Sequence, residues 1–165
     1  MKAKGLTLIE LLVTLAIISL VALMSIPNFQ RFISQRELAN ATAQVVHLVH
    51  HARLMALAHG GAFLCDGEQG CQRFSRPNSL AVHLPATLDG EAASTPFYWA
   101  TLPTHISVQW RRFRGHHLYF NQQGRALFMN GHFLLCHEQR SDVASKVVIN
   151  WNGRARIETT DASNC

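Results

Sequence analysis

The stretch Gly5-Leu6-Thr7-Leu8-Ile9-Glu10 opens an apolar run that ends at Ile26-Pro27, and it places one carboxylate inside a segment otherwise apolar enough for a membrane. The 21 residues from Leu6 to Ile26 would form a helix about 31 Å long, which matches the ~30 Å hydrocarbon core of a bilayer. Glu10 is the only formal charge in the run. Because a charge at the centre of a spanning helix costs about 2.5–3.5 kcal/mol, Glu10 is a candidate functional residue that needs a partner.

The residues before the apolar run indicate a segment that is retained. The basic head, Lys2 and Lys4, is short, and the small residue Gly5 precedes the run. A secretory signal has a longer head and a small-residue cleavage site after its apolar run. Only the head is therefore available for removal. The two lysines also predict that the head is cytoplasmic and that residues beyond Pro27 lie across the inner membrane.

Lys4-Gly5, followed by Leu6-Thr7-Leu8-Ile9-Glu10-Leu11 and the long apolar run, resembles the prepilin signal of type IV pilins and type II secretion pseudopilins. The resemblance implies that a prepilin peptidase cuts after Gly5 and that the new terminal amine of Leu6 is methylated. It also implies that Glu10 pairs with the terminal amine of a neighbouring subunit, since each charge offsets the other's desolvation in lipid. The alternative is an ordinary single-pass anchor with an incidental Glu10.

The chain is expected to contain a leader at 1–5, a transmembrane and assembly helix at 6–27 and a soluble domain at 28–165. A stripe of apolar residues with steps of three and four predicts an amphipathic helix at 28–59, which Gly60-Gly61 would end. The stripe is expected to pack on a sheet, and it consists of Leu38, Ala41, Val45, Leu48, Ala52 and Met55.

Beyond Gly61 the apolar residues recur with period two, which predicts an antiparallel β domain at 62–165. The fold class is therefore α+β, in a pilin-like arrangement of one long N-terminal helix whose second half packs on a C-terminal sheet. The expected strands are bounded by turn residues such as Asn130-Gly131 and Asn152-Gly153, and they cover 62–65, 79–84, 106–110, 117–121, 126–129, 132–136, 146–151 and 154–159.

Four cysteines in an exported domain favour disulfides, and three pairings are formally possible. The short interval from Cys65 to Cys71 suits a local clip on a turn, in which case Cys136 would hold Cys165. The spacing does not match the two-to-four-residue knuckle of a zinc site.

The C-terminal region has a second resemblance. Leu118-Tyr119-Phe120-Asn121-Gln122-Gln123-Gly124, together with Gly153-Arg154-Ala155-Arg156, resembles the GspH/FimT branch of pilin-like proteins. In that branch FimT-type minor pilins are associated with binding DNA during natural transformation through a Gly-Arg-x-Arg motif. The resemblance assigns that role here to Gly153, Arg154 and Arg156.

The residues themselves agree with an anionic partner. In an extended strand Arg154 and Arg156 would project from one face about 6.6 Å apart, so that each could hold a phosphate. Two neutralised phosphates give a log-log salt slope of only about −1.8, so further cations are expected to contribute. These are Arg111, Arg112, Arg114, Arg125 and Lys146, with Trp110, Phe113 and Trp151 as candidate stacking residues. The alternative is that the arginines are solvated strand positions and the aromatics are core.

The sequence predicts no enzyme, no cofactor and no metal site. His47 and His51 share a helical face, but no His-Glu-x-x-His pattern or third ligand accompanies them. Two functions remain. One is a minor pilin, anchored in the inner membrane and then displayed in a surface filament, that binds DNA non-specifically during uptake. The alternative is a structural minor pilin or type II secretion pseudopilin that binds only other subunits and primes filament assembly.

Overall fold

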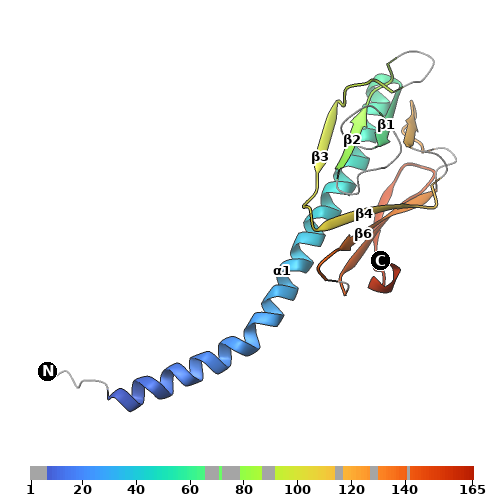
Figure 1. Ribbon diagram of the computed structural model, residues 1–165. Helices are drawn as coiled ribbons and strands as arrows, with labels where there is room; N and C mark the ends of the chain where they lie inside the picture. Colours follow the sequence, from blue (N-terminus) through green and yellow to red (C-terminus); the bar gives the residue numbers. More distant parts are fainter. Residues whose placement is uncertain are drawn as a thin grey trace. The chain divides into compact units, whose positions relative to one another are not determined.

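The computed structural model of the chain (Figure 1) describes residues 7–65, 71, 79–86, 92–113, 117–126, 130–140 and 142–165. A single long helix, α1 (Leu8–His59), precedes the strands. The strands are β1 (Gly61–Cys65), β2 (Ser79–His83), β3 (Tyr98–Thr101), β4 (Ile106–Arg111), β5 (Leu118–Asn121), β6 (Gly131–His137), β7 (Ala144–Ile149) and β8 (Ala155–Glu158), and a short 3-10 helix, Ala162–Asn164, follows them. Gly5, Leu6 and Arg114, to which the sequence analysis gave roles, lie outside the described residues.

The chain divides into two compact units, Met1–Arg36 and Glu37–Cys165, and α1 contributes residues to both. In the first unit the large apolar side chains that the structure describes on α1, from Leu8 to Ile33, are exposed. By length and composition α1 is able to cross a membrane, with a mean hydropathy of 2.5 in its most apolar window and none of that window buried.

The start of α1 gives Glu10 a defined position. The Glu10 backbone N–H donates to Thr7 Oγ1 at 3.3 Å, and the Leu11 N–H donates to the Thr7 carbonyl at 3.2 Å. Thr7 is therefore the N-cap, and Glu10 occupies the place of the acidic residue in a capping box. A carboxylate in the first turn is also favoured by the helix dipole.

The second unit is built on two antiparallel four-stranded sheets, with strand orders β3-β2-β1-β5 and β4-β6-β7-β8. Figure 1 shows the C-terminal half of α1, in cyan to green, running alongside β1, β2 and β3. One apolar core joins the helix to both sheets, with Phe120 and Phe133 among its largest fully buried side chains. The helix contributes Leu38, Ala41, Val45, Leu48, Val49, Ala52 and Ala56.

The predicted helix stripe is confirmed, since its first five residues are buried in the core and Met55 packs against it. Met55 is only partly buried, and Ala56 occupies the fully buried place one residue later. The helix ends at His59, as predicted, because Gly60 adopts φ +82°, a left-handed conformation that favours glycine and ends the helical hydrogen bonding.

Two strand predictions need correction. The stretch 98–101 forms β3, an edge strand that pairs with β2 and exposes most of its side chains. It lacks the alternation of buried and exposed residues on which the sequence analysis depended, although its aromatic content favours a strand. Ala126 was expected to begin a strand but has no strand structure, and 127–129 lie outside the described residues.

Both disulfides follow the pairing that the cysteine spacing favoured. Cys65 at the end of β1 is bonded to Cys71, and Cys136 in β6 is bonded to the C-terminal Cys165. The second bond closes a segment with a sequence separation of 29 residues, so it fixes the end of the chain to the end of an inner strand, β6.

Candidate nucleic-acid interface

Two turns with the same sequence pattern, Asn-x-x-Gly-Arg, lie at the ends of β5 and β7, and residues of the second turn line the candidate site. In the first, Asn121 Oδ1 accepts the Arg125 N–H at 2.9 Å, and the Gly124 N–H donates to the Asn121 carbonyl at 2.7 Å. In the second, Asn150 Oδ1 accepts the Arg154 N–H at 3.0 Å, and the Gly153 N–H donates to the Asn150 carbonyl at 2.9 Å. Each turn therefore ends on an arginine held by the preceding asparagine.

The two turns pack against each other through Gly153. Its φ is +72°, and a Cβ at this position would lie 2.4 Å from the Gly124 carbonyl oxygen and 3.1 Å from the Phe120 ring. The glycine in the Gly-Arg-x-Arg motif is thus needed for the turn and for its close approach to the first turn. Gly153 is buried, so its part is to position Arg154.

Strand register brings charges from four strands to one face of the second sheet. Arg111 in β4 lies opposite His132, His132 opposite Val148, and Val148 opposite Arg156. Two residues away on the same face of the sheet, Lys146 in β7 lies opposite Glu158 in β8. The opposite face of the sheet carries Phe133 and Val147 into the core, so the charged rows face outward.

This face is hollowed into a groove of about 420 Å³, here called the basic groove. Arg112 immediately follows β4 and has φ 63°, a left-handed conformation that is uncommon for arginine. The charged, ionisable and aromatic lining residues are Arg112, His132, Lys146, Trp151, Arg154, Arg156 and Glu158.

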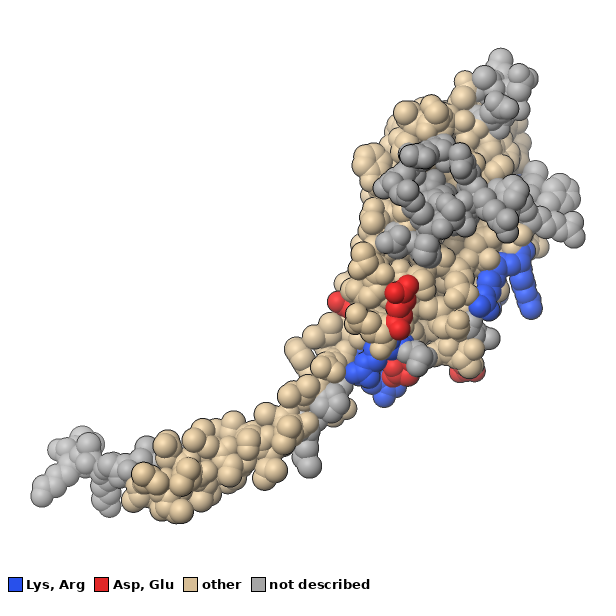
Figure 2. All heavy atoms as spheres, in the orientation of Figure 1, with Lys and Arg blue, Asp and Glu red and all other residues tan. Residues whose placement is uncertain are grey.

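Glu158 is the one acidic residue among the lining residues of the basic groove. Lys146 Nζ donates to Glu158 Oε2 at 2.9 Å, and Arg156 Nη2 donates to Oε1 at 2.6 Å. The Lys146 hydrogen bond, reinforced by the Arg156 charge, lowers the pKa of Glu158, so this carboxylate stays ionised near neutral pH. Across the whole molecule, the face shown in Figure 2 carries Lys and Arg side chains and Asp and Glu side chains close together. Glu158 therefore offsets part of the positive charge of the groove.

His132 lies among the cations of the groove. Its pKa is lowered from the ordinary 6.5, first by desolvation and then by the charges of Lys146, Arg112 and Arg111, against an opposing contribution from Glu158. His132 is therefore mainly neutral at neutral pH, and an anion placed beside it would favour its protonation.

The additional cations that the sequence predicted do not all line the groove. Arg112 and Lys146 line the groove, whereas Arg111 donates to Gln109 Oε1 through Nε at 3.0 Å. The Arg125 guanidinium lies 5.6 Å from the ring centroid of Trp151, which is half exposed and lines the groove. Arg125 is thus connected to the groove through an aromatic ring.

The three aromatic residues predicted to stack on bases also differ in their exposure. Trp110 and Phe113 pack against the core, with their ring centroids 3.9 Å apart, so neither is free to stack on a base. Trp151 alone of the three is exposed.

Two residues of the groove, Glu158 and His132, were not predicted from the sequence. Glu158 could have been found, because period two places it on the face of Arg154 and Arg156, but His132 joins them only through the β6 register.

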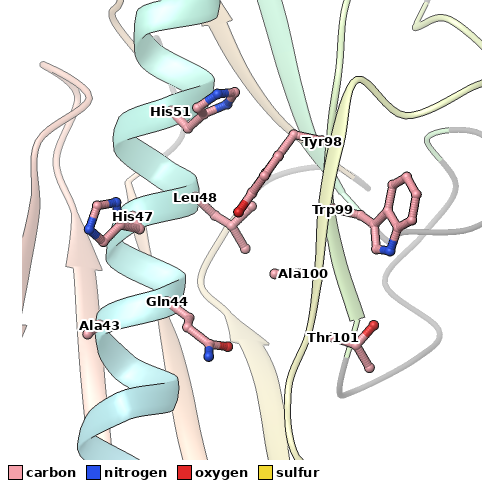
Figure 3. Close-up of a pocket in the computed structure, with 9 residues that line it drawn as sticks. All are labelled: Ala43, Gln44, His47, Leu48, His51, Tyr98, Trp99, Ala100 and Thr101. Atoms are coloured by element: carbon pink, nitrogen blue, oxygen red, sulfur yellow. The ribbon is translucent and has the colours of Figure 1, made fainter.

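A second hollow of about 580 Å³ lies between α1 and β3 (Figure 3). The Tyr98 side chain is directed toward the helix, where the His51 ring is 4.9 Å from it between centroids, and the Trp99 side chain is on the other side of the strand. Phe97, Tyr98 and Trp99 are about half exposed. This surface is aromatic and has no lysine or arginine among its lining residues, so it does not suit a phosphate.

Comparison with known proteins gives a family match, a sequence relative and a set of similar solved structures. Residues 1–26 match the family model described as a prokaryotic N-terminal methylation motif. The chain is 36% identical over 66 residues to prepilin peptidase-dependent protein D of Escherichia coli (strain K12). That alignment covers 40% of this chain and only 45% of the relative, so it spans less than half of either protein.

Solved structures show the fold. The minor pilin FimU of Pseudomonas aeruginosa (strain PAO1) is similar with a TM-score of 0.57 and 18% identity, over 80% of this chain and 94% of that one. The minor pseudopilin EpsH of the type 2 secretion system of Vibrio cholerae is similar with a TM-score of 0.53 and 14% identity, over 74% of this chain and 97% of that one. At these identities the likeness concerns the fold.

Proposed function

We propose that this chain is a type IV pilin-like protein, namely a minor pilin that binds DNA non-specifically through the basic groove during DNA uptake. Pilin-like proteins are structural subunits, so it is not an enzyme. The observation that carries the proposal is that Arg112, Lys146 and the two motif arginines, Arg154 and Arg156, line one outward-facing groove.

The chemistry of the groove suits a nucleic-acid backbone. The Arg156 side chain is 73% exposed, and guanidinium groups bind phosphate oxygens through paired N–H donors. Contacts to phosphates do not depend on the base sequence, so the groove should bind DNA of any sequence. Exposed Trp151 adds one aromatic face on which a base of single-stranded DNA can stack.

The proposed route to that role begins at the membrane. We infer that a prepilin peptidase cuts after Gly5, that Leu6 is methylated, and that Glu10 pairs with the amine of a neighbouring subunit as the protein leaves the inner membrane for a surface filament. Two observations support this route. Residues 1–26 match the prepilin motif, and the part of α1 that lies in the first unit is apolar and exposed.

A titration tests the proposal. The full chain, purified in a non-ionic detergent, is added to fluorescent DNA of mixed sequence, and anisotropy is measured from 20 to 200 mM salt. If Arg112, Lys146, Arg154 and Arg156 each neutralise one phosphate, the log-log salt slope is about −3.6 for duplex and about −2.8 for single strands. Failure to bind at the lowest salt, or binding without salt dependence, would contradict the proposal.

Replacing Glu158 with glutamine should strengthen DNA binding about tenfold at low salt. The change removes the carboxylate that holds Lys146 and Arg156 and frees both cations for phosphates. Anisotropy titration of Glu158→Gln against the unmodified chain measures the effect. Glu138→Gln is the matched control, since it removes the same charge just beyond the other end of β6. Equal affinities for the two variants would mean that the groove does not contact DNA.

DNA binding should also strengthen as the pH falls through the range below 6.5. The pKa of His132 is lowered in the free protein, and a bound phosphate raises it, so binding takes up protons in the window between the two values. The surrounding charges are Arg111 at the end of β4, Arg112 immediately after it, Lys146 from β7, and Arg156 and Glu158 from β8.

Titrations between pH 7.5 and 5.5 measure this dependence. His132→Gln should flatten it, whereas His50→Gln, a change at an exposed helical histidine, should leave it intact. An identical pH dependence in the unmodified chain and in His132→Gln would show that other groups are responsible.

A second candidate function, the priming of filament assembly without DNA binding, is favoured by the exposed aromatic residues of β3 and its flank. Phe97, Tyr98 and Trp99 present apolar area at an edge strand, where another subunit can pack. Absence of DNA binding together with loss of filaments in Tyr98→Ser would support this alternative.

A further inference from the structure

A cluster of three ligand-type side chains lies at the end of the second sheet remote from the basic groove. Glu37 belongs to α1, His105 immediately precedes β4, and His137 ends β6. Glu37 Oε2 is 2.9 Å from His105 Nε2 and 3.5 Å from His137 Nε2. The three donor atoms all lie within 4.8 Å of one another.

Backbone pairing holds the two histidines in place. Ile106 is the register partner of His137, so His105 is adjacent to it across the β4–β6 ladder. The Glu138 N–H donates to the His105 carbonyl at 2.8 Å, which fixes the segment that carries the His105 ring. The two rings lie 5.0 Å apart between centroids and are tilted by 44°.

His137 gives a second, independent indication of a ligand. Its side chain is 2% exposed, and neither Nδ1 nor Nε2 has a hydrogen-bond partner. The 3.5 Å separation from Glu37 is too long for a good hydrogen bond. A buried imidazole without partners costs free energy, and such a group in a native protein needs an explanation, for example an ion beside it.

We propose that Glu37, His105 and His137 bind a divalent transition-metal ion of the zinc type. Two imidazole nitrogens and one carboxylate oxygen are a common zinc ligand set, with bonds of about 2.0–2.2 Å. Tetrahedral ligands at that bond length are about 3.4 Å apart, so small side-chain adjustments from the observed separations suffice. Because Glu37 and His105 are partly exposed, at 38% and 28%, water can reach a fourth position.

The ion would join three elements that are distant in sequence. The site connects α1 to the loop before β4 and to the end of β6, one residue from the Cys136–Cys165 disulfide. Metal binding of this kind stabilises the folded form, because the separated ligands of the unfolded chain bind the ion weakly. The metal would therefore hold the second sheet on the helix.

The test uses the full chain without a histidine tag, in detergent and stripped of metal with a chelator. Zinc chloride is titrated by calorimetry, and thermal unfolding is followed with and without zinc. We expect one ion per chain and a rise in Tm of roughly 5–10 °C at a hundredfold excess over Kd. X-ray absorption of the zinc form should show nitrogen and oxygen ligands at about 2.0–2.1 Å.

Glu37→Gln and His105→Gln should each weaken zinc binding by about 100-fold or more, since loss of even a supporting residue costs 10–100-fold. Both side chains are partly exposed, so the variants should fold, which their metal-free thermal transitions will verify. His50→Gln is the control and should bind zinc like the unmodified chain. The proposal is overturned if zinc does not bind stoichiometrically, or if the two ligand variants bind it as tightly as the control.

Discussion

Replacement of Gly153 by alanine should lower the free energy of unfolding of the second unit by about 2–5 kcal/mol. The alanine would have to adopt φ +72°, a left-handed conformation that costs about 1–2 kcal/mol for a residue with a Cβ. That Cβ would also lie 2.4 Å from the Gly124 carbonyl oxygen, and overpacking of this kind costs a further 1–3 kcal/mol or so. Typical domains have a total stability of only about 5–15 kcal/mol.

Urea unfolding of the full chain in detergent, followed by tryptophan fluorescence, measures this loss. Gly60→Ala is the matched control, because Gly60 has a similar φ of +82° but nothing within 4 Å of a Cβ. It should lose only the conformational cost of about 1–2 kcal/mol. If Gly153→Ala were no less stable than Gly60→Ala, the packing of the two Asn-x-x-Gly-Arg turns would not be as described.

The double change of Arg154 and Arg156 to glutamine should weaken DNA binding roughly 30-fold at low salt, on the basis of about 1 kcal/mol for each lost charged contact. The salt slope should become shallower by about 1.8, because two phosphates are no longer neutralised. The double change also removes Arg156 as an ion-pair partner of Glu158. The negative charge of Glu158 is then offset only by Lys146, and it repels the phosphates more strongly.

Anisotropy titrations over the salt series measure both quantities. The control is Arg31→Gln with Arg36→Gln, which removes two positive charges from exposed positions on α1, outside the groove. This control should keep the salt slope of the unmodified chain. If the two double variants lost the same affinity and slope, binding would depend on net charge alone, and the groove would have no special part.

The sequence predicted much of the fold because the relevant signals are local. Helix periodicity from Leu38 to Ala52, the left-handed glycine at 60 and the alternation of the strands each depend on residues close in the chain. β3 was missed because it is an edge strand with most side chains exposed, so it shows no alternation. The site was predicted in part for the same reason: Arg154 and Arg156 are two residues apart.

By itself, the sequence of this protein determined the prepilin motif, the membrane-grade helix, the α+β class and the pair of arginines that follow Gly153, since each depends on the order and spacing of neighbouring residues. Only the tertiary structure placed Arg112, His132 and Lys146 in the same groove, set Glu158 against two of the cations, and brought Glu37 to His105 and His137. Strand register and helix packing set those contacts, and neither can be read from local spacing.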